Sequence, residues 1–272
     1  MRLRALPVLA TAGLLTLTAC GGSSSSDTSS SSSASSSSAE ETGGDLSGTL
    51  TVFAAASLTD VFTDLGDQLM ADNPDLTVTF NFAGSSALAT QLTQGAPADV
   101  FASANQTQMT VVTDAGLVAD DPTVFTENVL EIAVPEGNPA GVTGIDDFAD
   151  ADLTLAICAA DVPCGAAAEK VFESAGITAQ PDTLEEDVRA ALTKVELGEV
   201  DAALVYATDV QAAGNSVEGI EFPEAEDAIN SYPISTLSAS ANPEAAQAFL
   251  DLVESDEGQQ ALEDAGFRAP SS

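Results

Sequence analysis

Residues 50–65 read LTVFAAASLTDVFTDL, and this stretch indicates how the chain folds. It begins with a short apolar run, 50–53, that is typical of a buried strand. From Ser57 onward, apolar residues recur at spacings of three, four and seven, which predicts an amphipathic helix. Because a helix start offers free backbone N–H groups and the positive end of a dipole, this junction suits an anion. The alternative is that Ser57 only caps its helix.

A second junction of the same kind follows closely. Residues 78–82 alternate as a strand, and Gly84-Ser85-Ser86 then opens a helix with Leu88 and Leu92 on its apolar side. Two serine-led helix starts so close together favour one shared ligand over two unrelated caps.

Short apolar strands and amphipathic helices alternate along the rest of the chain. This alternation predicts an α/β fold with mostly parallel sheets, in which ligands lie beyond the carboxyl ends of the strands. The expected strands are 50–55, 77–82, 99–102, 129–134, 153–157 and 202–206. The expected helices are 58–71, 86–94, 105–114, 165–175, 187–197, 243–253 and 256–265.

The amino-acid composition argues against several classes of function. The chain has 272 residues, of which 44% are hydrophobic, enough for one large domain or two lobes. Six Lys and Arg against 43 Asp and Glu give a net charge of −37, which argues against nucleic acid and anionic membranes as partners. The sequence has no histidine, which excludes a Ser-His-Asp triad, and it has no nucleophile elbow, so an extracytoplasmic hydrolase is the less favoured alternative. We therefore expect no enzyme, no cofactor and no direct metal ligands.

The N-terminus reads as an export signal with a lipid attachment site. Arg2 and Arg4 precede an apolar run, 6–17, that is too short to span a bilayer, so residues 1–19 are predicted to be a signal peptide. Leu-Thr-Ala-Cys at 17–20 resembles the lipobox of bacterial lipoproteins, which implies lipid on Cys20; the alternative is an incidental cysteine. Residues 20–48 are dominated by serine and are expected to form a lipid-anchored flexible linker.

Several linked motifs identify a family. In order, they are AAASLTD (54–60), FAGSSALATQL (82–92), GAPADVFASANQ (95–106), DVPCGAAAEKVF (161–172), EDVRAALTKVELGEVDAALVYATD (186–209) and YP (232–233). From about residue 50 to residue 270, the chain resembles the extracytoplasmic molybdate-binding proteins of bacterial molybdate ABC importers. The resemblance implies a two-lobed type II periplasmic-binding-protein fold with an oxyanion in the cleft, delivery to a membrane permease, and a monomer. Lobe 1 would comprise 49–127 plus 230–270, and lobe 2 would comprise 128–229.

The same resemblance implies five ligand contacts. Ser57 and Ser85 match hydroxyl donors from the first lobe, and Tyr206 matches a hydroxyl donor from the second. Val188 and Cys164 match backbone N–H donors, although the family more often has a small residue such as alanine in place of this cysteine. Without the resemblance, Tyr206 would be interpreted as a core tyrosine and Val188 as helix packing.

Molybdate is a fully deprotonated tetrahedral dianion near neutral pH, so it only accepts hydrogen bonds. A carboxylate in the pocket would instead favour a protonated oxyanion such as hydrogen phosphate. None of the five positions is acidic, which favours molybdate, tungstate or sulfate; the alternative function is a binding protein for sulfate or another tetrahedral oxyanion. Arg189 is expected to orient the loop or to pair with a neighbouring acid such as Glu186 or Asp187, rather than contact the ligand. A structural or adhesive lipoprotein would not need the paired serine junctions.

The cysteines predict one disulfide. With Cys20 assigned to lipid, Cys158 and Cys164 remain as an even pair in an oxidising compartment. They flank the loop that is expected to donate to the anion, so a bond would hold that loop rigid. Two buried free thiols are the alternative.

Overall fold

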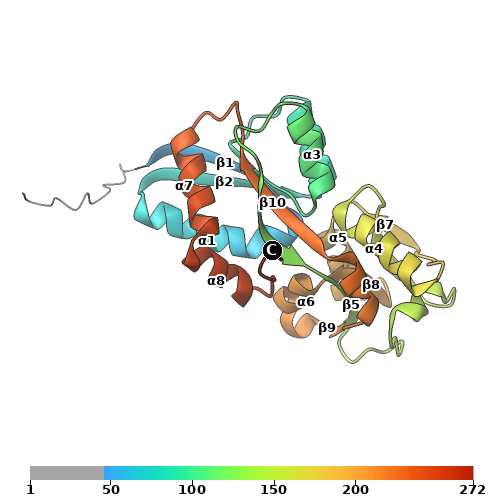
Figure 1. Cartoon of the computed structure of the whole chain (residues 1–272). Helices are drawn as coiled ribbons and strands as arrows, with labels where there is room; N and C mark the ends of the chain where they lie inside the picture. The colour runs from blue at the N-terminus through green and yellow to red at the C-terminus, as the bar shows by residue number, and fades with distance from the viewer. Residues whose placement is uncertain (1–45, 272) are drawn as a thin grey trace, which may run out of the picture. The chain divides into compact units, whose positions relative to one another are not determined.

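A computed structural model of the chain describes residues 46–271 (Figure 1). The predicted signal peptide, the lipid attachment site at Cys20 and the serine-rich linker up to residue 45 lie outside the described residues. Within 46–271, no helix is both long enough and apolar enough to cross a membrane.

The described residues alternate between strands and helices along the whole length. The strands are β1 (Ser47–Ala55), β2 (Asp75–Ala83), β3 (Val100–Ala102), β4 (Thr123–Asn128), β5 (Leu130–Pro135), β6 (Leu155–Cys158), β7 (Thr183–Glu185), β8 (Ala202–Tyr206), β9 (Val217–Ile220) and β10 (Asn230–Thr236). The α-helices are α1 (Thr59–Asp72), α2 (Ser85–Thr93), α3 (Gln106–Asp114), α4 (Pro163–Ala175), α5 (Val188–Glu196), α6 (Ala207–Ala213), α7 (Pro243–Glu254) and α8 (Asp256–Asp264). Short 3-10 helices are η1 (Ala56–Leu58), η2 (Ile145–Ala149), η3 (Gly214–Ser216) and η4 (Pro223–Ala228).

The first sheet has the order β2-β1-β3-β10-β4. Strand β1 is parallel to β2 and β3, whereas β10 is antiparallel to β3 and β4. Helices α1, α7 and α8 lie beside this sheet in Figure 1. Their apolar sides meet in a buried core. There the rings of Phe62 and Phe249 pack edge to face, with their centroids 5.2 Å apart. The motif 50–65 therefore contributes both a strand and a helix to this core.

The second sheet repeats the arrangement with the order β7-β6-β8-β5-β9. Here β6 is parallel to β7 and β8, and β5 is antiparallel to β8 and β9. Helices α4 and α5 pack on it and close its hydrophobic core. The chain passes from the first sheet to the second between β4 and β5, and it returns at β10.

The predicted two-lobed α/β fold is confirmed, but the sheets are mixed rather than mostly parallel. Each sheet has two parallel and two antiparallel pairings. The antiparallel pairings are those of β10 with β3 and β4, and those of β5 with β8 and β9.

Four strands and one α-helix were not anticipated from the sequence: β4, β7, β9, β10 and α6. β7 has three residues and α6 has seven, too few to show a period. Strand β9 contains Gly219, and β10 contains Pro233, residues that weaken a strand pattern. The ladder between β10 and β4 shifts register at Tyr232 and Pro233, so a bulge accommodates the proline inside the sheet.

Candidate functional site

The five residues that the sequence singled out lie around one small cavity. Its empty space, counted together with the solvent at its mouth, is about 200 Å³, and its walls come from both lobes. Each of the five is almost completely buried, with between 1% and 5% of its surface exposed. The full lining is Ala55, Ala56, Ser57, Ala83, Gly84, Ser85, Ala104, Val162, Pro163, Cys164, Asp187, Val188 and Tyr206.

Helix starts supply the backbone donors of this cavity. Ser85 is the first residue of α2, Val188 is the first residue of α5, and Cys164 is the second residue of α4 after Pro163. The first N–H groups of a helix have no partner within it, and the helix dipole places partial positive charge at that end. Three helices thus direct N–H groups toward the cavity, as an anion requires.

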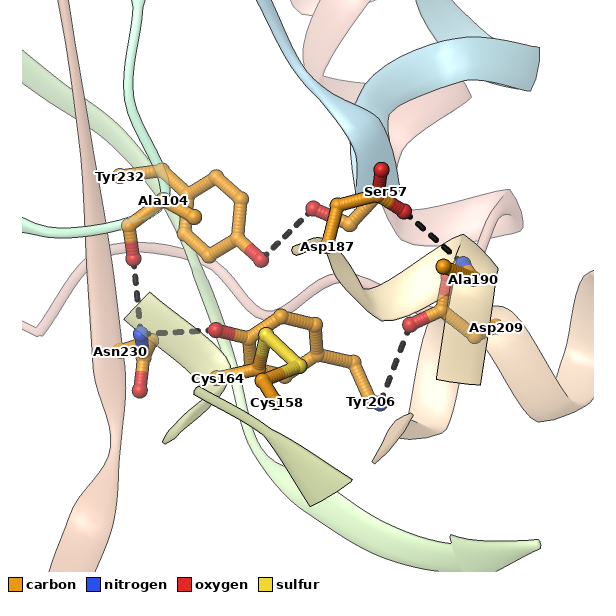
Figure 2. The surroundings of a disulfide bond; sticks show 10 residues. All are labelled: Ser57, Ala104, Cys158, Cys164, Asp187, Ala190, Tyr206, Asp209, Asn230 and Tyr232. Carbon is orange, nitrogen blue, oxygen red and sulfur yellow. Dashed lines mark hydrogen bonds between the residues drawn. A yellow bond between two sulfur atoms is a disulfide. The ribbon is translucent and has the colours of Figure 1, made fainter. Parts of the chain in front are cut away.

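The two serines do not cap their helices, contrary to the simpler interpretation of their position. Ser57 belongs to η1, and neither its hydroxyl nor that of Ser85 makes a side-chain cap. Ser57 Oγ lies 2.9 Å from Tyr232 Oη, whereas Ser85 Oγ accepts a hydrogen bond from the backbone N–H of Ala104 at 3.0 Å. Both hydroxyls are therefore engaged with residues beyond their own helices (Figure 2 shows the first contact).

Tyr206 brings a hydroxyl from the second lobe. It lies at the end of β8 and just before α6, where its backbone N–H donates to Asp209 Oδ2 at 3.0 Å. Its Oη accepts from Asn230 Nδ2 at 2.9 Å. Burial, followed by the nearby Tyr232 and Asp209, raises the pKa of Tyr206 well above its ordinary value. The phenol therefore stays protonated and keeps a hydrogen to donate.

A disulfide joins Cys158 and Cys164 beside the cavity (Figure 2). It links the end of β6 to the start of α4, across the loop that was expected to donate to the anion. The next residue is Gly165, where a Cβ would lie 1.9 Å from the carbonyl oxygen of Ala159. The loop is therefore closed tightly, with both cysteine side chains buried.

Arg189 does not pair with Glu186 or Asp187 as expected; it pairs with Asp60 and Asp209. Its Nε lies 3.1 Å from Asp209 Oδ1, but the two atoms are not aligned for a hydrogen bond, so the contact is an ion pair. Burial raises the pKa of Asp209 to about 7, and Arg189 opposes that increase. Asp209 is fully buried and Glu186 is exposed, so the carboxylate of Asp209 gains more from a nearby cation. This explains why Arg189 pairs with Asp209.

One carboxylate, that of Asp187, does line the cavity. The sequence had placed no acid among the expected ligands. Asp187 is the N-cap of α5, and its Oδ1 accepts from the backbone N–H of Ala190 at 2.9 Å (Figure 2). Because this carboxylate oxygen is bonded to the first turn of α5, we interpret Asp187 as the residue that caps this helix.

A larger open hollow of about 1000 Å³ lies elsewhere and does not contain the expected residues. Its walls include Glu131, Glu221 and Glu226, and Arg268 already holds Glu226 by two hydrogen bonds of 2.8 and 2.9 Å. Burial, and then the charge of Glu221, raise the pKa of Glu131. So much negative charge makes the hollow unsuitable for an oxyanion. Among residues 46–271, no group of acids and cysteines is arranged to hold a metal ion.

The sequence missed the residues that support the hydroxyls, namely Asn230, Tyr232 and Asp209. Asn230 and Tyr232 come from a strand that was not expected, and Asp209 from a helix that was not expected. For Tyr232 and Asp209 the only available signal was their place within motifs of the resembled family, YP at 232–233 and the end of 186–209, and Asn230 lies outside both motifs.

Two α/β lobes around a buried cavity of hydrogen-bond donors define a solute-binding protein. The chain belongs to the bacterial extracellular solute-binding protein family, whose sequence model matches residues 50–268. It is 42% identical over 222 residues to the molybdate-binding protein ModA of Mycobacterium tuberculosis H37Rv, a match that covers 82% of this chain and 85% of the relative. The resemblance to bacterial molybdate-binding proteins is thereby confirmed.

Solved structures show the same fold. The periplasmic molybdate-binding protein of Azotobacter vinelandii superposes with a TM-score of 0.68 at 16% identity, covering 82% of this chain and all (100%) of that one. The sulfate-binding protein SubI from M. tuberculosis also reaches 0.68, at 17% identity, covering 81% of this chain and 86% of that one. Fold likeness alone therefore does not distinguish the two ligands.

Proposed function

We propose that this chain is an extracytoplasmic binding protein that captures molybdate, and also tungstate, and delivers the anion to an ABC permease. One observation carries the proposal: the hydroxyls of Ser57, Ser85 and Tyr206 and the helix-start amides of Cys164 and Val188 line one buried cavity that contains no lysine or arginine. The 42% identity to a mycobacterial molybdate-binding protein supports the choice of ligand.

The donor set matches the chemistry of the anion. A deprotonated tetrahedral dianion offers only acceptors, so hydroxyl and amide donors satisfy it without a counter-charge. Helix dipoles and amides act at contact distance and in a site shielded from water, where each interaction is stronger than in bulk solvent. The protein acts as a carrier and not as an enzyme, and it needs no cofactor.

The remaining parts of the proposal concern how the protein is held and divided. We propose that lipid on Cys20 anchors the chain to the outer face of the membrane, and that residues 20–48 serve as the linker between anchor and domain. The two lobes are assigned as 49–127 plus 230–270 and 128–229, with a monomer as the working unit.

Calorimetric titration with molybdate, tungstate, sulfate and phosphate, carried out on the same preparation, tests the ligand. We expect molybdate and tungstate to bind most tightly and phosphate most weakly. In the double variant Ser57→Ala with Ser85→Ala, molybdate binding should be lost, whereas Ser86→Ala, one residue from Ser85 and outside the cavity, should bind as the wild type does. Undiminished binding by the double variant would reject the site.

The second candidate is a sulfate-binding protein. The observation in its favour is the equal structural likeness to SubI, a TM-score of 0.68. If sulfate bound more tightly than molybdate in the same titration series, this alternative would replace the first.

A further inference from the structure

Arg189 connects the two lobes through its charged side chain. It is the second residue of α5, which packs on the second sheet, and its Nη2 donates to the carboxylate of Asp60 in α1, which packs on the first sheet. Its Nε lies 3.1 Å from Oδ1 of Asp209, which belongs to α6 in the second lobe. Of these two ion pairs, the one between Asp60 and Arg189 crosses from one lobe to the other.

The three charged residues are neighbours of residues that are proposed to contact the anion. The arginine directly follows Val188 at the start of α5. Asp209 Oδ2 accepts from the backbone N–H of Tyr206 at 3.0 Å (Figure 2). Asp60 lies one helical turn after Ser57, where η1 passes into α1. The cross-lobe ion pair therefore joins two helix starts that line the cavity from opposite lobes.

The cross-lobe ion pair lies outside the cavity. Asp60 and Arg189 line an open groove beside it, and Ser57 lines both the groove and the cavity. The carboxylate of Asp209 is fully buried and holds the guanidinium in the second lobe, whereas 61% of the Asp60 side chain is exposed. If the lobes separate, Arg189 keeps its buried partner and water hydrates Asp60, so the cross-lobe pair can break without leaving a buried charge unpaired.

We propose that Asp60 and Arg189 are positioning residues whose ion pair holds the lobes closed and so sets the rate at which the bound anion is released. The inference deepens the proposed function and rests on it. Neither residue lines the cavity, so the pair acts through the separation of the helix starts that carry Ser57 and Val188. An interaction that exists only in the closed form stabilises the complex and slows dissociation, but it takes no part in the encounter with the open form.

Asp60→Asn is the sharpest variant, because it removes the charge and keeps the shape of the side chain. Replacing Arg189 would be less informative, since it would also leave the buried carboxylate of Asp209 without its cation. The matched control is Asp64→Asn. Asp64 is exposed on the same helix and makes no ion pair within residues 46–271, and its replacement changes the net charge by the same amount.

Stopped flow with molybdate gives the association and dissociation rates. The chain has two tyrosines and no tryptophan, so tyrosine fluorescence can report on binding. The measurement is made at pH 8, where Asp209 is charged, because burial raises its pKa to about 7. We expect dissociation to be about two- to fivefold faster in Asp60→Asn than in Asp64→Asn, with equal association rates, and the calorimetric Kd to rise by the same factor.

Two further measurements distinguish an ion pair from a general structural role. Asp60→Lys places a second cation beside Arg189 and should speed dissociation more than Asp60→Asn does, relative to its own control Asp64→Lys. In about 1 M salt, the difference between Asp60→Asn and Asp64→Asn should shrink, because an exposed ion pair is screened. Thermal unfolding without ligand should be the same for the Asp60 and Asp64 variants.

Faster dissociation in both Asp60 variants than in their controls, with equal association rates and a difference that shrinks in salt, supports the proposal. Equal dissociation rates in the Asp60 and Asp64 variants would overturn it and leave the proposed function standing. Less stable Asp60 variants whose faster dissociation did not depend on salt would show a merely structural role and would also overturn it. If the wild type bound no molybdate, the proposed function itself would fail, and this inference with it.

Discussion

Gly84 allows the two lobes to close over the cavity. It precedes α2 in the first lobe, and a Cβ placed on it would lie 2.3 Å from the backbone carbonyl oxygen of Glu186 in the second. The backbone of Gly84 has φ −58° and ψ 134°, angles that alanine adopts without strain. The substitution Gly84→Ala should therefore leave each lobe intact and act only on the contact between the lobes.

The size of the effect follows from that distance. Real Cβ contacts shorter than 3.0 Å are essentially unknown, so the separation must grow by at least about 0.7 Å from 2.3 Å, and the opposing atom is backbone that cannot rotate away. Overpacking of this kind costs about 1–3 kcal/mol. If that free energy opposes only the closed form, the molybdate affinity should fall by about 5- to 150-fold.

Calorimetric titration with molybdate measures the loss, and thermal unfolding without ligand checks that the lobes remain folded. Gly144→Ala is the matched control, because a Cβ at Gly144 meets nothing within 4 Å and its φ of 176° suits any residue. We expect its affinity to equal that of the wild type. An unchanged Kd in Gly84→Ala would refute the reasoning, because it would show that binding does not require this contact.

Four further predictions concern the site and its surroundings. Ser85→Ala removes a donor to a charged ligand and should weaken molybdate binding by about 10- to 150-fold in calorimetry; a change below twofold would argue against direct contact. Replacing Cys158 and Cys164 together with alanine opens a short loop and should lower the free energy of unfolding by about 2 kcal/mol in denaturant titrations. Burial raises the pKa of Asp209 to about 7, so the stability contributed by its protonated form is complete below the ordinary pKa of aspartate and is lost as the pH rises toward 7. Asp209→Asn should therefore flatten the pH dependence of the free energy of unfolding in that range. An identical slope in the two proteins would contradict this. Finally, the net charge of −37 repels a dianion at long range, so the association rate in stopped flow should rise with ionic strength, and a fall would contradict the screening argument.

The parts of the fold that the sequence predicted are those with a clear period. The strand and helix of 50–72 were recognised from apolar spacing alone, because β1 is buried and α1 places its apolar residues on one side. The missed elements lack such a signal. Strand β10 contains Pro233, which is tolerated because a bulge shifts the register there, and such a bulge depends on the partner strand.

The residues of the candidate site also differ in how far the sequence could predict them. Ser57 and Ser85 could be suspected from the local pattern, because strand, small residues and helix follow one another in sequence. Tyr206 and Val188 could not, since their side chains look like ordinary core packing, and only the family resemblance drew attention to them. The partners of Arg189 were predicted wrongly because Asp60 and Asp209 are distant in sequence and become neighbours only in the folded chain.

The hydrogen bonds of Asn230 link the cavity to closure of the lobes. Asn230 lies where the chain returns to the first lobe, and its amide bonds at once to Ala104 of the first lobe and to Tyr206 of the second. The contact between Ser57 and Tyr232 lies in the first lobe and can persist without the second. If the lobes moved apart, Asn230 would lose one of its two partners. The hydrogen bonds that hold Tyr206 at the cavity would therefore be complete only when the lobes are closed.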